Sequence, residues 1–441
     1  MPENLKLTLS QLEQIADTYG TPLYLYDKNA IEKNGNNFMK ILKSQIPLFK
    51  QYFAVKALPN LAIMEILLNC GMGFDCSSIT EVQLVNELNT GTTKPEILYT
   101  SNYTSVEDFQ FVLQHDNIII NLDDIDGLDN LIEASKLSKC KLPEKISFRF
   151  NPSIGKTDSE TKSNVLGGRD TKFGICKERI VEAYLAAKIH GFKRFGIHVM
   201  TGSCVMNVEY WVALIDEVFT VMNYIQTTAK IMFDFVDLGG GIGIPYKPSQ
   251  LGVPIESLAK TIALTIKKHT DKICFEKTLA IYMENGRYIT GPYGWLISRC
   301  KSIKKSDKKF YGLDACMANL MRCGMYEAYH HITIPRLCYK DGNDFEEANV
   351  VGTLCENNDW FARDRMLPKD IRKNDIFVIH DTGAHGHCMG FQYNGKLRSA
   401  EVLFETLSDG TINCSVIRNK ETYEYLVQNQ TKNKDVLRLL L

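Results

Sequence analysis

The stretch Phe49-Lys50-Gln51-Tyr52-Phe53-Ala54-Val55-Lys56-Ala57-Leu58-Pro59-Asn60 decides the fold, because it contains the unit from which most of the chain is built. Residues 49–54 form a short apolar and aromatic run that predicts a strand. Residues 61–68, which follow, have apolar positions at helical spacing. Lys56 lies at the end of the predicted strand, so the unit ends in a residue capable of chemistry.

The same strand-then-helix unit recurs through the first two thirds of the 441-residue chain. We predict eight strands, at residues 49–54, 73–76, 97–100, 118–121, 146–151, 195–199, 233–238 and 279–283. Helical patterns lie between them, at residues 61–68, 79–88, 106–114, 128–137, 179–189, 208–227 and 255–268. This alternation predicts the α/β class, with parallel strands joined by helical crossovers.

Eight such units can close into a (β/α)8 TIM barrel, and a doubly wound open sheet is the alternative. Polar residues follow strand after strand: Lys56, Asp75, Asn102, Asn151, His198, Gly239–Gly241 and Glu284. In a closed barrel these strand ends converge on one mouth, whereas an open sheet would spread them along an edge. Polar residues at the end of strand after strand would form a single site in a barrel, so their recurrence favours the barrel over the open sheet.

The pattern changes after about Arg287, which predicts a second domain. Strand-like runs at residues 296–298, 310–313, 332–334, 349–351, 376–380 and 400–404 indicate a C-terminal β-sandwich or β-barrel domain. A predicted helix at residues 9–19 and a strand at 23–26 precede the barrel. We therefore divide the chain into residues 1–27, expected to pack on the β domain, residues 28–286, the barrel, and residues 287–441, the β domain. Two domains also suit a chain longer than a single core usually supports.

The composition argues against several classes of partner. A net charge of -1 lacks the basic excess of a protein that binds nucleic acid or an anionic membrane. The opening residues Met1 to Lys6 do not resemble a signal sequence, and no stretch reaches the apolar length of a bilayer span, so we expect a cytoplasmic protein. Thirteen cysteines without a C-x-x-C pair indicate neither a disulfide framework nor a metal site. A small molecule is the expected partner.

Three features together point to pyridoxal phosphate (PLP) as the cofactor. Burial would lower the pKa of Lys56 and let its free amine form a Schiff base, although a lysine that simply reaches solvent is the alternative. The run Gly239-Gly240-Gly241 follows the seventh strand, where backbone N–H groups can bind phosphate, although a tight turn that needs positive φ would also explain it. Glu284, after the eighth strand, can keep a pyridine nitrogen protonated, so that the ring stabilises a carbanion on the substrate.

These motifs resemble those of the barrel-type (fold-type III) PLP decarboxylases of basic amino acids. The resemblance rests on residues 54–57, 239–246 and 284–287. The C-terminal motifs, at residues 314–322, 325–331, 354–359 and 381–386, look most like those of the diaminopimelate decarboxylases. The resemblance implies that the protein converts meso-2,6-diaminopimelate to L-lysine and carbon dioxide, the last step of lysine biosynthesis.

The resemblance also implies residue roles. Lys56 would hold the cofactor covalently. The other implied cofactor-binding residues are Asp75, His198, Met200, Ser203, Gly239, Gly240, Gly241, Glu284, Gly286, Arg287 and His385. The implied substrate-binding residues are Arg287, Arg322, Tyr326, Glu356 and His385. Cys355 matches the catalytic proton donor, which in the family reaches across a dimer interface, so the resemblance implies a homodimer with shared active sites.

The chain departs from the family pattern around the predicted site. The family commonly has two histidines here, two positions apart, and one of them stacks on the cofactor ring. In this chain the second position is Met200. A thioether can also pack on an aromatic ring, and His198, which is retained, could supply the stacking. His385 replaces a tyrosine, and Asn357-Asn358 replaces smaller residues. We assign His330 and His331 a structural role. Two further hypotheses are a decarboxylase of ornithine, lysine or carboxynorspermidine, and a non-catalytic homologue.

Overall fold

The computed structural model describes residues 5–88, 91, 94–158, 165–271, 279–337 and 344–431. The eight predicted strands form a closed parallel barrel in chain order, from β2 to β9. The barrel closes where Phe49 of the first strand pairs with Ile281 of the last. The structure thus confirms the TIM barrel and rules out the open sheet. Residues 1–4 lie outside the described residues, and they are part of the segment that we expect not to be a signal sequence.

The barrel elements lie within two residues of their predicted bounds. The strands are β2 (Phe49–Ala54), β3 (Gly73–Cys76), β4 (Ile97–Ser101), β5 (Ile118–Leu122), β6 (Lys145–Arg149), β7 (Arg194–His198), β8 (Phe233–Asp237) and β9 (Ala280–Met283). The predicted helices are α3 (Leu61–Asn69), α4 (Ile79–Asn86), α5 (Val106–Val112), α6 (Asp126–Ser138), α7 (Ile180–Ile189), α8 (Val208–Ala229) and α9 (Ile255–Thr270). Ser78, Ser105 and Asn207 cap three of these helices by accepting a backbone N–H, which explains where they begin.

Helix α2 (Lys28–Gln45), just before the first barrel strand, was not predicted from the sequence. Its sequence contains Gly35 and four asparagines, which are poor helix formers, so local propensity gives little signal. Ile31, Phe38 and Leu42 are nevertheless buried along one face. Tertiary packing of that face therefore stabilises the helix.

A layer of large side chains fills the inside of the barrel. Tyr52, Leu98, Phe235 and Tyr282 come from four different strands and form one buried cluster. The Phe235 and Tyr282 rings stack with their centroids 4.5 Å apart. Gly196 makes room for this layer, because a Cβ there would lie 2.0 Å from the Phe235 ring. Since apolar side chains block the barrel, polar chemistry is confined to its carboxyl-terminal mouth.

The C-terminal third and the N-terminal strand β1 together form a nine-stranded mixed sheet in the order β14-β13-β11-β10-β1-β16-β17, with β15 pairing β10 and β12. Its strands are β1 (Leu23–Asp27), β10 (Gly294–Lys305), β11 (Lys309–Leu313), β12 (Ile332–Thr333), β13 (Phe345–Val351), β14 (Trp360–Pro368), β15 (Ile376–Ile379), β16 (Ala400–Thr406) and β17 (Ile412–Arg418). The N-terminal strand β1 lies inside this sheet, between β10 and β16. The sequence did not predict β14 or β17, whose residues are mostly exposed or only partly buried.

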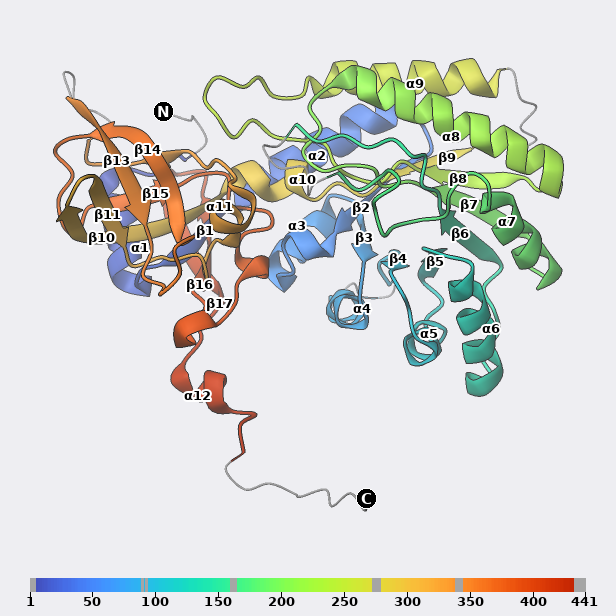
Figure 1. The fold of residues 1–441 in the computed structure, drawn as a ribbon, viewed down its shortest axis with the longest axis horizontal. Coiled ribbons are helices and arrows are strands. Elements are labelled where there is room, and N and C mark those ends of the chain that lie inside the picture. Colours follow the sequence, from blue (N-terminus) through green and yellow to red (C-terminus); the bar gives the residue numbers. More distant parts are fainter. Residues whose placement is uncertain are drawn as a thin grey trace.

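Figure 1 shows the sheet domain beside the barrel, with α1 (Leu9–Tyr19) against the sheet and α12 (Tyr423–Val427) extending away from it. Between the sheet domain and the barrel lie α10 (Arg287–Thr290) and α11 (Met321–Tyr326). In the described part of the chain, none of the helices combines the length and hydropathy that a membrane span would need. The boundaries at residues 27/28 and 286/287 remain our division of the chain.

Candidate functional site

A cavity of about 490 Å³ opens at the carboxyl-terminal mouth of the barrel. Ten residues singled out from the sequence line it: Lys56, Met200, Ser203, Gly241, Glu284, Gly286, Arg287, Arg322, Tyr326 and His385. They come from the ends of β2, β7, β8 and β9 and from loops and a short helix of the C-terminal third. The fold therefore brings together residues that are up to 329 positions apart in sequence, from Lys56 to His385.

Lys56 does not have the lowered pKa that the sequence predicted. Its Nζ forms an ion pair with Asp75 Oδ2 at 2.8 Å, and its side chain is 46% exposed. Partial burial acts to lower the pKa of Lys56, but the charges of Asp75 and Glu284 outweigh it and raise the pKa above its usual value. Burial and the charge of Glu284 also raise the pKa of Asp75 to about 7, although Lys56 opposes this shift. The prediction of a free amine at Lys56 is therefore wrong for the protein without bound cofactor, because the side chain is an ammonium group.

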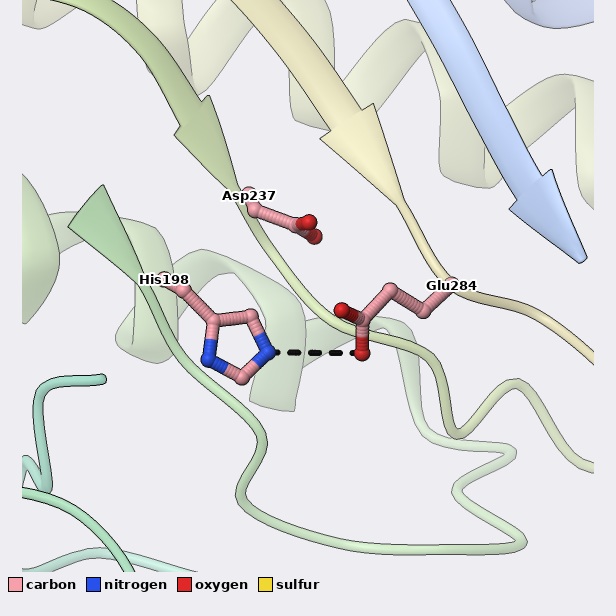
Figure 2. A group of neighbouring side chains, drawn as sticks. All are labelled: His198, Asp237 and Glu284. Carbon is pink, nitrogen blue, oxygen red and sulfur yellow. Dashed lines mark hydrogen bonds and ion pairs between the residues drawn. The ribbon is translucent and has the colours of Figure 1, made fainter. Parts of the chain in front are cut away.

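Three buried side chains converge from the ends of neighbouring strands, as Figure 2 shows: His198 of β7, Asp237 of β8, and Glu284 just after β9. His198 Nε2 lies 3.3 Å from Glu284 Oε2, and Asp237 Oδ1 accepts the backbone N–H of Gly239 at 2.8 Å. Burial raises the pKa of Glu284, but the charge and hydrogen bond of His198 dominate and lower it. Burial and the charge of Glu284 raise the pKa of Asp237 well above its usual value. Glu284 is therefore the ionised carboxylate of the group.

His198 and Met200 occupy different places. His198 is 1% exposed, does not line the cavity and contacts Glu284 through Nε2, so its stacking on a cofactor ring stays a prediction. Met200 does line the cavity, and its Sδ accepts the backbone N–H of Gly240 at 3.3 Å. That hydrogen bond fixes the thioether on the cavity wall, where it can pack on an aromatic face.

The glycine run does need glycine. Gly239 and Gly241 have φ values of +67° and +103°, which other residues rarely adopt. A Cβ on Gly240 would lie 2.3 Å from the Glu284 carbonyl oxygen, and one on Gly241 would lie 2.3 Å from the Gly202 carbonyl oxygen. Of the three, only Gly241 lines the cavity. The run therefore provides both the tight turn and a side-chain-free wall.

Two buried arginines face the cavity. Arg287 and Arg322 are 7% and 3% exposed, and both donate to the hydroxyl of Tyr246, at 2.5 and 3.0 Å. Arg287 also donates to Ser203 Oγ at 3.2 Å. Burial lowers the pKa of Arg322, and the neighbouring charge of Arg287 acts in the same direction. No carboxylate of the described residues forms an ion pair with either guanidinium, so their charge is available to an anionic ligand.

His385 and Tyr326 complete the wall of the cavity. The backbone N–H of His385 donates to the Ala57 carbonyl at 2.8 Å, which ties its loop to the residue after Lys56. Desolvation, and then the charges of Arg287 and Arg322, lower the pKa of His385 well below its usual value. The imidazole is therefore neutral and can donate one hydrogen bond and accept another.

Other predicted site residues lie outside this cavity in the same chain. Cys355 and Glu356 are exposed, and neither lines it. The backbone N–H of Cys355 donates to Asn394 Oδ1 at 2.7 Å. Asn151, expected at the mouth, instead accepts and donates hydrogen bonds within the loop that follows β6. Asn102 does not line the cavity either.

Sequence reasoning missed several residues of the site. Glu81, Cys388 and Met389 line the cavity, and Asp237 belongs to the buried group with His198 and Glu284. Asp237 ends the strand that leads into the glycine run, so its position carried a usable signal. Glu81 accepts a hydrogen bond from the Ser77 backbone in the first turn of α4, and its sequence resembles an ordinary helix start.

Residues 30–291 match the family model described as pyridoxal-dependent decarboxylase, pyridoxal binding domain. The match covers more than half of the chain. The chain belongs to the pyridoxal-dependent decarboxylase family. This decarboxylase is 37% identical to protein TabA of Pseudomonas amygdali pv. tabaci, over 94% of its own chain and 92% of TabA. It is 33% identical to the diaminopimelate decarboxylase of Methanothermobacter thermautotrophicus, over 95% and 93% of the two chains.

A solved structure of the M. jannaschii diaminopimelate decarboxylase with L-lysine is also similar to this decarboxylase. The TM-score is 0.84 at 28% identity, and the match covers 95% of this chain and 94% of that one. These likenesses confirm the fold-type III architecture and the pyridoxal cofactor. They also show that the decarboxylase is an enzyme of the carboxy-lyase class.

The cavity of the decarboxylase suits PLP. Glu284 Oε1 and Arg287 Nε are buried and have no hydrogen-bond partner among the described residues, so the site offers one anionic acceptor and one cationic donor to a ligand. A protonated pyridine nitrogen matches the first, and a phosphate matches the second together with Ser203 and the glycine wall. Lys56 lies on the same cavity, where it can hold the cofactor aldehyde.

Proposed function

We propose that the protein decarboxylates meso-2,6-diaminopimelate to L-lysine and carbon dioxide, as the last step of lysine biosynthesis. Its relatives of 30–33% identity are named diaminopimelate decarboxylases, and similar solved structures hold L-lysine. The observation that carries the proposal is the pair of buried guanidinium groups, Arg287 and Arg322, on the cavity that also contains Lys56 and Glu284. A substrate without a second carboxylate would leave one of these charges unpaired.

Each residue then has a defined task. Lys56 would hold the cofactor covalently, and Glu284, ionised by His198, would keep a proton on the pyridine nitrogen. Bound PLP supplies an electron sink for the charge left at the substrate α-carbon when carbon dioxide leaves. Ser203 and Arg287 would bind the phosphate. Arg322 and Tyr326 would grip the carboxylate that remains in the product, and neutral His385 can hydrogen bond to either ligand.

The return of a proton to the α-carbon requires a second subunit in this proposal. Cys355 and Glu356 are exposed and lie outside the cavity of their own chain. We therefore infer a homodimer in which the Cys355 thiol donates the proton and Glu356 contacts the substrate in the partner's site. The expected cytoplasmic location stays a prediction.

Carbon dioxide release from the PLP-loaded protein tests the substrate. We expect turnover of meso-diaminopimelate and little turnover of ornithine, lysine or carboxynorspermidine. Turnover of one of these three without diaminopimelate would refute the substrate. A protein that cannot be loaded with PLP would support a non-catalytic homologue. Lys56→Ala should abolish covalent attachment of the cofactor, whereas Lys50→Ala, at the far end of the strand β2 that Lys56 follows, should not.

Mixed dimers test the shared site. Lys56→Ala and Cys355→Ala should each be nearly inactive alone. After the two proteins exchange subunits at random, about half of the dimers are mixed. Each mixed dimer has one of its two sites with both residues intact, so about a quarter of all sites should work. Failure to recover activity, while subunit exchange is demonstrated by mass, would contradict the shared site.

A further inference from the structure

The guanidinium of Arg322 is held by two uncharged acceptors. Its Nη1 donates to His330 Nε2 at 2.7 Å and to the Tyr246 hydroxyl at 3.0 Å. Its Cζ lies 4.7 Å from the centre of the Tyr246 ring. Arg322 belongs to the short helix α11, and Tyr246 lies in the loop after β8, so the contact joins the β domain to the barrel.

The tautomer of His330 follows from its two partners. His330 Nδ1 lies 2.7 Å from the carbonyl oxygen of His380, which can only accept, so Nδ1 carries the hydrogen. Nε2 is then the lone-pair nitrogen, which is the state that a guanidinium donor requires. His330 is 0% exposed, and burial and the charge of Arg322 lower its pKa well below the usual value. The imidazole is therefore a neutral acceptor.

Tyr246 connects the two arginines. Its hydroxyl oxygen accepts from Arg287 at 2.5 Å and from Arg322 at 3.0 Å, which uses both of its lone pairs. Arg287 in turn contacts Ser203 on the proposed phosphate side of the cavity. One phenol thus fixes the spacing between the guanidinium on the phosphate side and the guanidinium on the substrate side.

We propose that His330 and Tyr246 are positioning residues that aim Arg322 at the carboxylate retained in the product. This inference rests on the proposed function. A carboxylate in either place would hold the guanidinium equally well but would neutralise it. Two uncharged acceptors orient Arg322 and leave its full charge for the ligand, so they determine that the site takes a ligand with a distal carboxylate.

A pair of substitutions at His330 separates its two hydrogen bonds. Gln places an oxygen near the position of Nε2 and keeps the acceptor for Arg322. Asn places its amide near the position of Nδ1 and keeps only the contact with the His380 carbonyl. Tyr246→Phe removes the shared acceptor and retains the ring. It provides an independent variant if a change at His330 prevents folding.

Binding to the PLP-loaded enzyme, measured by calorimetry, tests the proposal. L-lysine carries the retained carboxylate, and cadaverine, the corresponding diamine, lacks it. We expect His330→Asn and Tyr246→Phe to weaken L-lysine binding by about 10-fold to 100-fold, and to raise KM for diaminopimelate more than they lower kcat. His330→Gln should remain within about threefold of the wild type. Cadaverine binding should change little in all three variants.

The outcomes separate this inference from the proposed function. If the wild-type enzyme does not turn over diaminopimelate, the proposed function fails. If it does, and His330→Asn and Tyr246→Phe bind L-lysine like the wild type, the positioning role is wrong. Equal losses for Asn and Gln, or equal losses for L-lysine and cadaverine, would show that His330 only supports packing, which also overturns the inference.

Discussion

Removal of Asp75 should make Lys56 reactive at lower pH. The charge of Asp75, whose Oδ2 lies 2.8 Å from Lys56 Nζ, is the largest of the interactions that raise the pKa of Lys56, and the substitution Asp75→Asn keeps the shape while removing the charge. An opposite charge at this range shifts a pKa by about 1–3 units. Because 46% of the Lys56 side chain is exposed, solvent screens the interaction, and we take the lower limit, about 1 unit.

The initial rate at which saturating PLP attaches to the cofactor-free protein reports the free amine. It can be followed by visible absorbance, or by borohydride trapping, from neutral to alkaline pH. A shift of about 1 unit corresponds to about tenfold more free amine at pH 8 to 9, where Asp75, whose pKa is raised to about 7, is ionised, so Asp75→Asn should react about tenfold faster there. Its rate profile should move to lower pH by the same amount.

The control is Asp234→Asn, because Asp234 pairs with Arg194 at the opposite end of the barrel. It should leave the profile unchanged. An unchanged profile in Asp75→Asn, or a shift to higher pH, would refute the argument that the charge of Asp75 holds the amine protonated.

Three further predictions follow from single contacts. Cys355→Ala should keep the visible absorbance of the bound cofactor but slow product formation in steady-state assays, and an unchanged rate would show that another group delivers the proton. Gly240→Ala should lower the free energy of unfolding in denaturant titrations by about 1–3 kcal/mol, because its Cβ would lie 2.3 Å from the Glu284 carbonyl; Gly312→Ala, with 3.6 Å to its nearest neighbour, should change it little. Burial lowers the pKa of His380 to about 3, so the unfolded chain binds a proton below about pH 6.5 that the folded protein does not. His380 alone should make stability fall by about 1.4 kcal/mol per pH unit below about pH 6.5, in addition to the contributions in the same direction from His330 and His385, and urea titrations of His380→Gln should show a slope smaller by that one proton; an equal slope would contradict the assignment.

The barrel could be predicted because its signals are local. Each strand is a short apolar run, and each helix has its own apolar face and, at Ser78, Ser105 and Asn207, its own cap. Helix α2 could not be predicted in the same way, because its asparagines disfavour a helix and only packing stabilises it. Strands β14 and β17 lack an apolar alternation, since most of their residues are not buried.

The site shows the same division. Lys56, the Gly239–Gly241 run and Glu284 could be found from their positions at strand ends, and the barrel brings them to one mouth. The protonated state of Lys56 could not be predicted, because it depends on Asp75 of the next strand, whose Oδ2 lies 2.8 Å from Lys56 Nζ. We assigned His330 a structural role from the sequence, because no sequence pattern indicates that its Nε2 accepts a hydrogen bond from Arg322.

The sequence by itself determined the fold class, the strand ends that form the mouth, and the residue types that suit PLP chemistry, since all of these follow from patterns within a few residues. Only the tertiary structure decided which of those groups are charged and where they point. It paired Lys56 with Asp75, turned His198 toward Glu284, and left Met200 on the cavity wall. Charge state and orientation depend on distances between segments that are remote in sequence, and those distances exist only after the chain has folded.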